Sequence, residues 1–267
     1  MHYSEHRPSP RLDSWVESYW ILSGQSNTPE SVATDGRMEV ILHLADPFEE
    51  LTTEGWRKQP RQLVSGQITR PVVFRPAGEV LTVGVRLRSW AGGALLREHA
   101  SRLTDRLVEL GAVNSRLARV LRPLMSRSEA APEALDALLR DFLNDDAIDR
   151  RICSAVTHTE RARGCGAVDA LSLHTGIGKR QIERLFQQHV GVGPKLFARM
   201  VRFRSVLRAM RGNSPPNWAD VAAGCGYSDQ AHLIRDFQQF AGRTPRAMWQ
   251  DAGNLNLQFA NCLADVD

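Results

Sequence analysis

The chain has 267 residues, a length that suits two ordinary domains with buried cores. With 42% hydrophobic and 24% charged residues, its composition argues against wholesale disorder, a collagen-like fibre and a coiled-coil rod. No run approaches the ~18 to 20 consecutive apolar positions of a membrane span, and the polar start from Met1 to Pro10 is unlike a signal peptide, so we expect a cytoplasmic protein that binds no membrane.

The charge is distributed unevenly along the chain. Residues 150–267 hold 16 Lys/Arg and nine Asp/Glu, a net charge of +7, whereas residues 1–149 carry a net charge of −3. Fourteen of those 16 basic residues are arginine, whose guanidinium suits bidentate hydrogen bonding to phosphate and guanine. The C-terminal part therefore favours a polyanionic partner, and a solvated basic surface without a specific partner is the alternative.

The first ~90 residues alternate between apolar and polar positions in short runs separated by turn signals such as Asp35-Gly36. The runs are Tyr19 to Leu22, Met38 to Leu44, Leu63-Val64, Val72 to Phe74 and Leu81 to Leu87. They predict an antiparallel β-barrel or sandwich. Four tryptophans, Trp15, Trp20, Trp56 and Trp90, are interpreted as buried core in preference to the lining of a ligand pocket.

After Trp90 the pattern becomes helical, with leucines recurring at spacings of three and four between Leu103 and Phe142. We expect these helices to pack on the barrel, and a dimer face is the alternative. The polar stretch Asn144 to Arg151 is the expected linker to a second domain.

The second domain contains an internal repeat. Arg184 to Lys195 aligns with Arg235 to Arg246, every matched pair being 51 residues apart, and Arg, Phe, Gln-Gln, Gly and Pro recur identically. Two copies of one supersecondary unit are therefore expected.

Each copy has the pattern of a helix, a tight turn and a second helix. In the first copy, Val168, Leu171 and Leu173 mark the short helix, His174 to Gly178 the turn, and Ile182, Leu185 and Phe186 the buried stripe of the second helix. In the second copy, Asn217 caps the short helix, Gly224 to Gly226 form the turn, and Ser228 is the expected cap of a helix that buries Leu233, Phe237 and Phe240.

The outward faces of the two second helices carry arginine and amide side chains, which are the groups that read base edges in a major groove. The candidate DNA-binding residues are Lys179, Arg180, Gln181, Glu183, Arg184, Gln230, Ala231, His232 and Arg235. A helix that begins at Pro194 and runs for about 16 residues, or ~24 Å, joins the copies. Such a spacer suits reading helices about one DNA turn (~34 Å) apart, so we expect double-stranded DNA to be bound through two successive major grooves.

Residues from about 165 to 249 resemble the DNA-binding domain of the AraC/XylS family of bacterial transcription regulators. The matching segments are Ala222 to Phe237 and Gly242-Arg243-Thr244-Pro245. The resemblance implies two helix-turn-helix units joined by a long helix, with base contacts from Arg180, Glu183 and Arg184 in the first unit and from Gln230, Ala231, His232 and Arg235 in the second. Gly178, where the family prefers a serine cap, and the apolar Ile234 depart from its pattern.

The N-terminal part resembles a barrel domain that precedes this DNA-binding domain in some uncharacterised regulators. The residues concerned are His6-Arg7-Pro8, Tyr19-Trp20, Asp35 to Glu39, Gly66-Gln67 and Arg70-Pro71. The resemblance implies a cupin-like barrel that binds a small effector or mediates dimerisation.

Metal and catalytic chemistry have little support in the sequence. None of the eight histidines forms a His-x-His pair, and Cys153, Cys165, Cys225 and Cys262 stand singly, so we expect reduced, mostly buried thiols, no metal and no cofactor. His43 and Glu39 share a strand face, which favours a polar pair or pocket wall over a metal site. No nucleophile or phosphate-loop motif occurs in a strand-to-helix context, so an enzyme is not expected.

These patterns predict an α+β protein of two domains: a barrel with trailing helices at 1–148, for effector sensing or dimerisation, and a DNA-binding domain at 149–267. The expected function is that of an effector-responsive, sequence-specific transcription regulator. A weakly specific architectural DNA binder and a barrel enzyme fused to a DNA-targeting domain are the alternatives. A small-molecule effector, a second copy of the chain and, for an activator, RNA polymerase are the further candidate partners.

Overall fold

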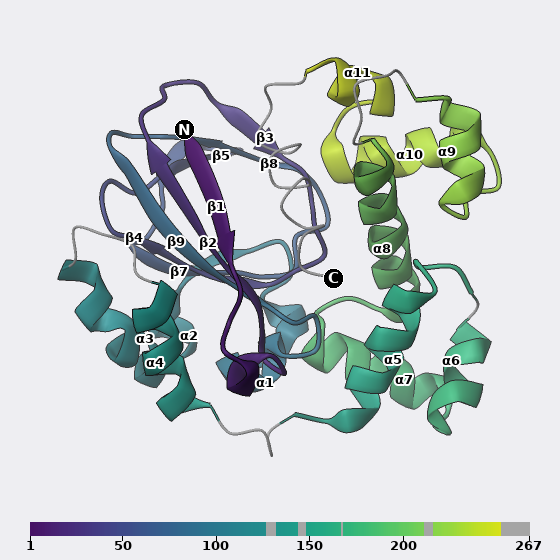
Figure 1. The fold of residues 1–267 in the computed structure, drawn as a ribbon, viewed down its shortest axis with the longest axis horizontal. Helices are drawn as coiled ribbons and strands as arrows, with labels where there is room; N and C mark the ends of the chain where they lie inside the picture. The colour runs from purple at the N-terminus through teal and green to yellow at the C-terminus, as the bar shows by residue number, and fades with distance from the viewer. Residues whose placement is uncertain (127–131, 144–147, 167, 211–215, 252–267) are drawn as a thin grey trace.

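The computed structural model describes residues 1–126, 132–143, 148–166, 168–210 and 216–251 (Figure 1). The first domain contains the strands β1 (His2–His6), β2 (Val16–Gly24), β3 (Glu30–Val32), β4 (Glu39–His43), β5 (Glu49–Thr52), β6 (Gly55–Lys58), β7 (Gln62–Ser65), β8 (Val72–Arg75), β9 (Val80–Leu87) and β10 (Leu107–Glu109). Its helices are α1 (Gly92–Leu96), α2 (Leu110–Val113), α3 (Ser115–Leu121) and α4 (Pro132–Phe142), with 3-10 turns η1 (Pro10–Leu12), η2 (Ala100–Arg102) and η3 (Arg122–Ser126).

The strands form two antiparallel sheets, one in the order β1-β2-β9-β4-β7-β10 and the other in the order β3-β8-β5-β6. All the predicted runs are strands. Five further strands, β1, β3, β5, β6 and β10, were not predicted, because their sequences are too short or too polar to show alternation. Leu107, expected in a helix, lies in β10, where pairing with β7 overrides its helical spacing.

Alternation along the larger sheet divides its residues between two environments. Val40, Leu42, Val83 and Val85 pack into a core with the helices α2 to α4, whereas Trp20 and Leu22 belong to a separate cluster on the opposite face. The core that contains Val40 and Val85 also holds the leucines of these helices, among them Leu117, Leu121, Leu135 and Leu139. The interpretation of these leucines as core is confirmed.

The second domain contains α5 (Arg150–Arg161), α6 (Val168–Thr175), α7 (Lys179–His189), α8 (Pro194–Ala209), α9 (Trp218–Gly224), α10 (Gln230–Ala241) and α11 (Pro245–Gln250). The repeat is present in the fold: α7 and α10 begin 51 residues apart, as do α8 and α11, each of which starts at a proline. The two-domain α+β fold, with two helix-turn-helix units joined by α8, is confirmed.

Two local predictions are wrong. Arg150 and Arg151, expected in the linker, begin α5, because Asp149 caps this helix by accepting from the Arg151 backbone N–H. Residues 144–147 of that linker lie outside the described residues, as do residues 212–215 of the segment Gly212 to Pro216, whose glycine and prolines predict the end of α8. His174 and Thr175, expected in a turn, belong to α6.

The prediction for the cysteines is also wrong. Cys225 is buried, but Cys165 is exposed and Cys153 is half-buried, so the described thiols are not mostly buried; Cys262 is not described.

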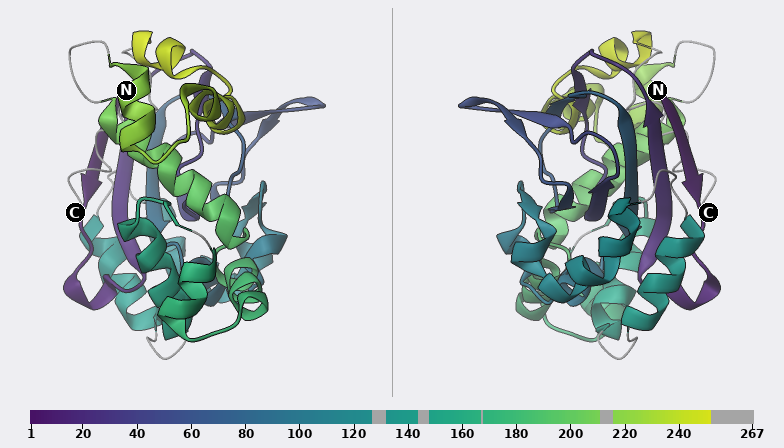
Figure 2. Two further views of the ribbon diagram at one scale, coloured as in Figure 1. Left: turned by 90° about the vertical axis from the view of Figure 1, so that its right-hand side faces the viewer. Right: turned by 90° about the vertical axis from the view of Figure 1, so that its left-hand side faces the viewer.

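Both helix-turn-helix units contact the barrel domain. α8 lies beside it, with α5 to α7 towards one end and α9 to α11 towards the other (Figures 1 and 2). In the first unit the Thr104 hydroxyl donates to the Gly191 carbonyl at 2.7 Å, and in the second the Thr34 N–H donates to the Phe240 carbonyl at 3.0 Å. Among the described helices, none has the length and hydropathy for a membrane crossing.

Equivalent glycines of the two units contact the same barrel loop, the β7–β8 loop at 66–71. Gly191 and Gly242 are 51 residues apart, and both have positive φ, 96° and 68°. A Cβ at Gly191 would lie 3.1 Å from the Gln67 side chain, and one at Gly242 would lie 3.1 Å from Pro71. Glycine thus allows the helix-ending turn and the close approach together.

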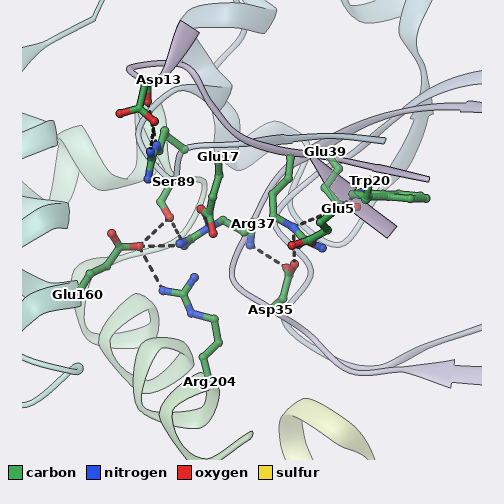
Figure 3. Close-up of polar contacts among 12 residues, drawn as sticks. Glu5, Asp13, Glu17, Trp20, Asp35, Arg37, Glu39, Ser89, Glu160 and Arg204 are labelled. Carbon is green, nitrogen blue, oxygen red and sulfur yellow. Dashed lines mark hydrogen bonds and ion pairs between the residues drawn. The ribbon is translucent and has the colours of Figure 1, made fainter. Parts of the chain in front are cut away.

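A buried cluster of two arginines and two glutamates joins the domains (Figure 3). Arg37, just before β4, pairs with Glu17 of β2 and reaches Glu160 of α5 at 2.9 Å. The same Glu160 oxygen accepts from Arg204 of α8 at 3.2 Å. Arg37 and Arg204 are 6% and 7% exposed, so removal of a carboxylate would leave a buried guanidinium without its counter-charge.

Glu160→Gln is therefore expected to destabilise the chain by about 3 kcal/mol, the cost of breaking a buried ion pair by removing one partner. Burial alone would raise the pKa of Glu160, but Arg37 and Arg204 outweigh it and lower the pKa from 4.5 to about 2. The contribution of Glu160 to stability should be present above pH 4.5 and be lost as the pH falls towards 2.

Urea denaturation at pH 7 and at pH 3 measures both effects. The matched control is Glu98→Gln, because Glu98 pairs with the largely exposed Arg102 and should contribute no more than about 1 kcal/mol. Equal stability losses in the two variants would mean that the buried cluster does not hold the domains together.

Candidate functional site

The helix α7 exposes the polar face that the sequence predicted. Lys179, Arg180, Glu183 and Arg184 are exposed and Gln181 is half-buried, whereas Ile182, Leu185 and Phe186 are buried. In the preceding helix, Leu171 is buried but Leu173 is 88% exposed, so only the first belongs to the core of this unit.

Glu183 is directed towards the start of α8. A Cβ on Gly193, the residue that precedes α8, would lie 2.4 Å from a carboxylate oxygen of Glu183. A carboxylate is favourable there, because the first N–H groups of a helix carry partial positive charge. Glu183 can therefore fix the angle between α7 and α8 as well as face a ligand.

The helix α10 exposes the equivalent face of the second unit. Gln230, Ala231 and Arg235 are exposed and His232 is half-buried, whereas Leu233, Phe237 and Phe240 are buried. The His232 ring lies edge-on against Tyr227, at 5.0 Å between centroids, and its Nδ1 is 3.2 Å from the Ser228 hydroxyl.

The cap of α10 is one residue later than predicted. Asp229, not Ser228, is the N-cap, and its carboxylate accepts from the His232 N–H at 2.7 Å. This bond and one from Ser228 lower the pKa of Asp229. The Ser228 hydroxyl donates to Asp229, so it supports the cap instead of forming it. The other caps follow the sequence: Asn217 caps α9, and Gly178 precedes α7 without a side-chain cap.

Three arginines of α8 contact protein groups. Arg199 binds the buried Asp236 at 2.7 Å, Arg202 donates to the Gly226 carbonyl at 3.2 Å, and Arg204 joins the interdomain cluster. These contacts give the three side chains a structural role. Trp218 and Trp249 are partly buried against the core of the second domain.

A second candidate site is a cavity of about 160 Å³ between the two sheets of the barrel. Three rows of residues on adjacent strands form one wall, since β4 pairs with β9, and β9 with β2. The first row places Arg86 opposite Glu39, the middle row holds Trp20, Gly84 and Ile41, and the third holds Leu22, Thr82 and His43.

The middle row is apolar, since Trp20 and Ile41 supply its only side chains and Gly84 has none. A Cβ at Gly84 would lie 1.9 Å from the Trp20 ring, so the indole occupies the space that a side chain at position 84 would need. Trp20 was predicted to be buried core and not pocket lining. It is buried, but it also forms part of the cavity wall. Trp15 is buried core as predicted, whereas Trp56 and Trp90 are only partly buried.

One end of the cavity is acidic. Arg86 is contacted by Glu5, by Glu39 at 2.9 Å and by Asp35 at 3.4 Å, and Glu39 also accepts from the Trp20 indole N–H at 3.1 Å. Burial raises the pKa of Glu39 to about 7; Arg86 opposes this rise and the charge of Asp35 adds to it.

The other end is polar and neutral. His43 contacts the Thr82 hydroxyl at 2.9 Å and the Gln59 carbonyl at 3.0 Å, and burial lowers its pKa to about 4. The interpretation of His43 and Glu39 as a pocket wall is thereby confirmed. Within the described ranges, no group of three or more His, Cys, Asp or Glu side chains is arranged to hold a metal ion.

The cavity reaches the second domain through two residues. Leu207 of α8 lies in its wall, one helical turn after Arg204, and Arg37 connects the wall to Glu160. Sequence reasoning did not single out Leu207, because its spacing marks it only as core. Arg37 lies in the segment Asp35 to Glu39, whose resemblance to the barrel domain of other regulators was the sequence signal for this residue.

Comparisons with known proteins match the two parts of the chain separately. A model of a domain of unknown function, DUF6597, matches residues 4–109, and a helix-turn-helix domain model matches residues 171–250.

The regulator GlxA of Rhizobium meliloti is 28% identical over 125 residues, which are 47% of this chain and 37% of GlxA. The regulator GbdR of Pseudomonas aeruginosa is 27% identical over 82 residues, 30% of this chain and 21% of GbdR. The matches thus span well under half the length of these relatives.

The similar solved structures include the following two. A probable AraC family transcriptional regulator from Rhodopseudomonas palustris is 26% identical, covers 39% of this chain and 98% of its own, and has a TM-score of 0.36. ToxT from Vibrio cholerae is 8% identical, covers 86% of this chain and 95% of its own, and has a TM-score of 0.48.

The N-terminal cap of α10 allows a direct test of the candidate DNA-binding surface of the second unit. Asp229→Ala should lower the thermal midpoint and weaken DNA binding, because the His232 N–H loses its acceptor at the start of the helix. Asp229→Asn should retain most of both, since an amide oxygen also caps. Ser228→Ala, the matched control, should have the smaller effect. Differential scanning fluorimetry with a DNA-affinity titration measures this, and a larger loss in Ser228→Ala would contradict the assignment.

Proposed function

We infer that this chain, which belongs to the AraC family through its C-terminal helix-turn-helix domain, is a sequence-specific transcription regulator whose DNA binding responds to an effector in the barrel. The observation that carries this proposal is the equivalence of Arg184 and Arg235. They stand 51 residues apart at the same position of α7 and α10, and each is exposed two residues before a buried phenylalanine, Phe186 or Phe237.

The exposed groups suit the edges of base pairs in a major groove. Arg184 and Arg235 can each place a guanidinium fork on guanine, Gln230 suits adenine, and Ala231 is small enough to contact a thymine methyl group. Lys179 and Arg180 lie in the first turn of α7, where their cationic side chains favour phosphate contact. The two helices would enter successive grooves of one duplex, with α8 as the spacer.

The contacts between the domains support control from the barrel. The loop at 33–37 and the loop at 66–71 both contribute to the cavity wall, through Thr34, Asp35, Arg37 and Ile68. The same loops contact the second domain at Phe240, Glu160, Gly191 and Gly242. A molecule that moves these loops would change the spacing or tilt of α7 relative to α10, and so the affinity for DNA.

We propose that the cavity binds a molecule without converting it, and that the regulator works in the cytoplasm, where bacterial DNA lies. A second copy of the chain, and RNA polymerase if the protein activates transcription, complete the proposed partners.

Base reading by the two arginines can be tested on the best duplex selected from a random pool. Arg184→Ala and Arg235→Ala should each cost ~1 to 3 kcal/mol on that duplex and relax the base preference of one half of it. Arg119→Ala, an exposed arginine of α3, is the matched control and should leave binding unchanged. A loss of equal size on every duplex would instead indicate a weakly specific architectural binder.

Control by the barrel is tested with a compound found by thermal-shift screening of the full chain. In the wild-type chain, a compound bound in the cavity should change the affinity for the selected duplex at least about fivefold. In Glu160→Gln, which loses the charged contact between the domains, the change should be less than twofold. A cavity ligand that leaves wild-type DNA affinity unaltered would remove effector control and leave DNA binding intact.

A further inference from the structure

The charges around the barrel cavity indicate which class of molecule it binds. This inference rests on the proposed function, since it names the effector of that same cavity. The interdomain cluster is balanced, with Arg37 and Arg204 facing Glu17 and Glu160. The acidic end is different, because the single guanidinium of Arg86 is contacted by three carboxylates, those of Glu5, Asp35 and Glu39.

This excess of carboxylates is largely withdrawn from water. The side chains of Glu5 and Glu39 are 8% and 15% exposed, and the second oxygen of Glu5 is buried without a hydrogen-bond partner among the described residues. Buried negative charge without full compensation is unfavourable, and burial accordingly raises the pKa of Glu39 to about 7. A cation that enters beside Asp35 and Glu39 would supply the missing counter-charge.

An aromatic ring lies next to these carboxylates. Trp20 occupies the row adjacent to Glu39 and Arg86, forms part of the cavity wall, and is fixed by its bond to Glu39 and by stacking on Tyr3. The faces of indole rings attract ammonium groups. The carboxylates and the indole ring at this end both favour a cation, and the carboxylates disfavour a carboxylate ligand.

The remainder of the wall sets the shape of the molecule. Glu39 and His43 are four residues apart on one strand, ~13 Å at the rise of an extended chain, with the apolar Ile41 between them. Leu22, Phe48 and Phe74 add apolar surface, and His43 and Gln59 form a neutral polar far end. The volume of about 160 Å³ is close to that of an engineered ~150 Å³ cavity that holds one benzene ring.

We propose that the barrel cavity binds a small organic cation, an ammonium group on an apolar or aromatic body, with the ammonium against Asp35 and Glu39 and the body over Trp20 towards His43. The two arginines in the wall are already engaged by carboxylates, so an anionic molecule would have to displace a protein carboxylate in order to bind.

Two matched series test the charge preference on the full chain by isothermal titration calorimetry at pH 8. One is 2-phenylethylamine, 2-phenylethanol and 3-phenylpropanoate, and the other is the corresponding 4-phenylbutyl amine, alcohol and carboxylate. At least one amine should bind ten times more tightly than its alcohol, with its carboxylate weakest. If neither amine exceeds its alcohol and its carboxylate, including the case in which nothing binds, the proposal is wrong.

Variants locate the binding. Glu39→Gln keeps an acceptor for Trp20 and Arg86 but removes the charge, so it should weaken the amine at least tenfold and leave the alcohol within threefold. Glu49→Gln, which alters an ion-paired carboxylate outside the cavity wall, is the matched control and should change neither. Ile41→Phe fills the middle of the cavity and should abolish amine binding without lowering the thermal midpoint. Unchanged amine binding in both Glu39→Gln and Ile41→Phe would place the ligand elsewhere and overturn the proposal.

The pH dependence gives a readout that a merely structural Glu39 would not show. Glu39 faces Trp20 of β2, Arg86 of β9, Glu5 of β1 and Asp35 of the preceding loop, while His43 remains neutral because its pKa is lowered to about 4. Between pH 8 and pH 6 Glu39 gains a proton and an alkylamine stays charged, so amine affinity should fall by up to about tenfold. The fall should vanish in Glu39→Gln, and an equal fall in that variant would contradict the assignment.

This proposal and the proposed function fail in different ways. A carboxylate that binds in the cavity and alters DNA affinity would overturn the cation and leave effector control standing. An amine that binds as described without altering DNA affinity would leave the cation site standing and overturn effector control.

Discussion

The fixed spacing between α7 and α10 is the constraint on which the rest of the structure depends. A single helix, α8, joins the two units, and its 16 residues correspond to ~24 Å. The barrel contacts both units at equivalent glycine turns, Gly191 and Gly242, so the spacing is held at three places and not by α8 alone. Further contacts run from the Thr34 N–H to the Phe240 carbonyl, from the Thr104 hydroxyl to the Gly191 carbonyl and from the Arg37 guanidinium to Glu160.

The same strands that build the barrel core also build its cavity. Because side chains alternate along a strand, one set of β4 and β9 residues packs under the helices while the other faces inward. The inward set is exceptional in composition, with Arg86, Glu39 and His43 in place of apolar residues. Burying these groups carries a cost that core packing does not require, and this supports the proposal that the inward face binds a ligand.

Much of the fold could be predicted because it is encoded over short distances. The 51-residue repeat identified the two helix-turn-helix units, helical spacing located α7, α8 and α10, and alternation located β2, β4, β7, β8 and β9. The exposed reading faces also followed from helical spacing. The position of the α10 cap could not be chosen from sequence, since Ser228 and Asp229 both suit a cap and only the backbone conformation selects Asp229. Arg37 and Glu160, 123 residues apart, and the excess of carboxylates around Arg86 arise from tertiary packing and leave no local pattern.

The most direct measurement of the central claim is a hydroxyl-radical footprint of the full chain on its selected duplex. Two reading helices held on one face by α8 and the barrel predict two protected segments on the same side of the duplex, with centres about 10 to 10.5 base pairs apart. A single protected segment, or two segments on opposite faces, would contradict the account.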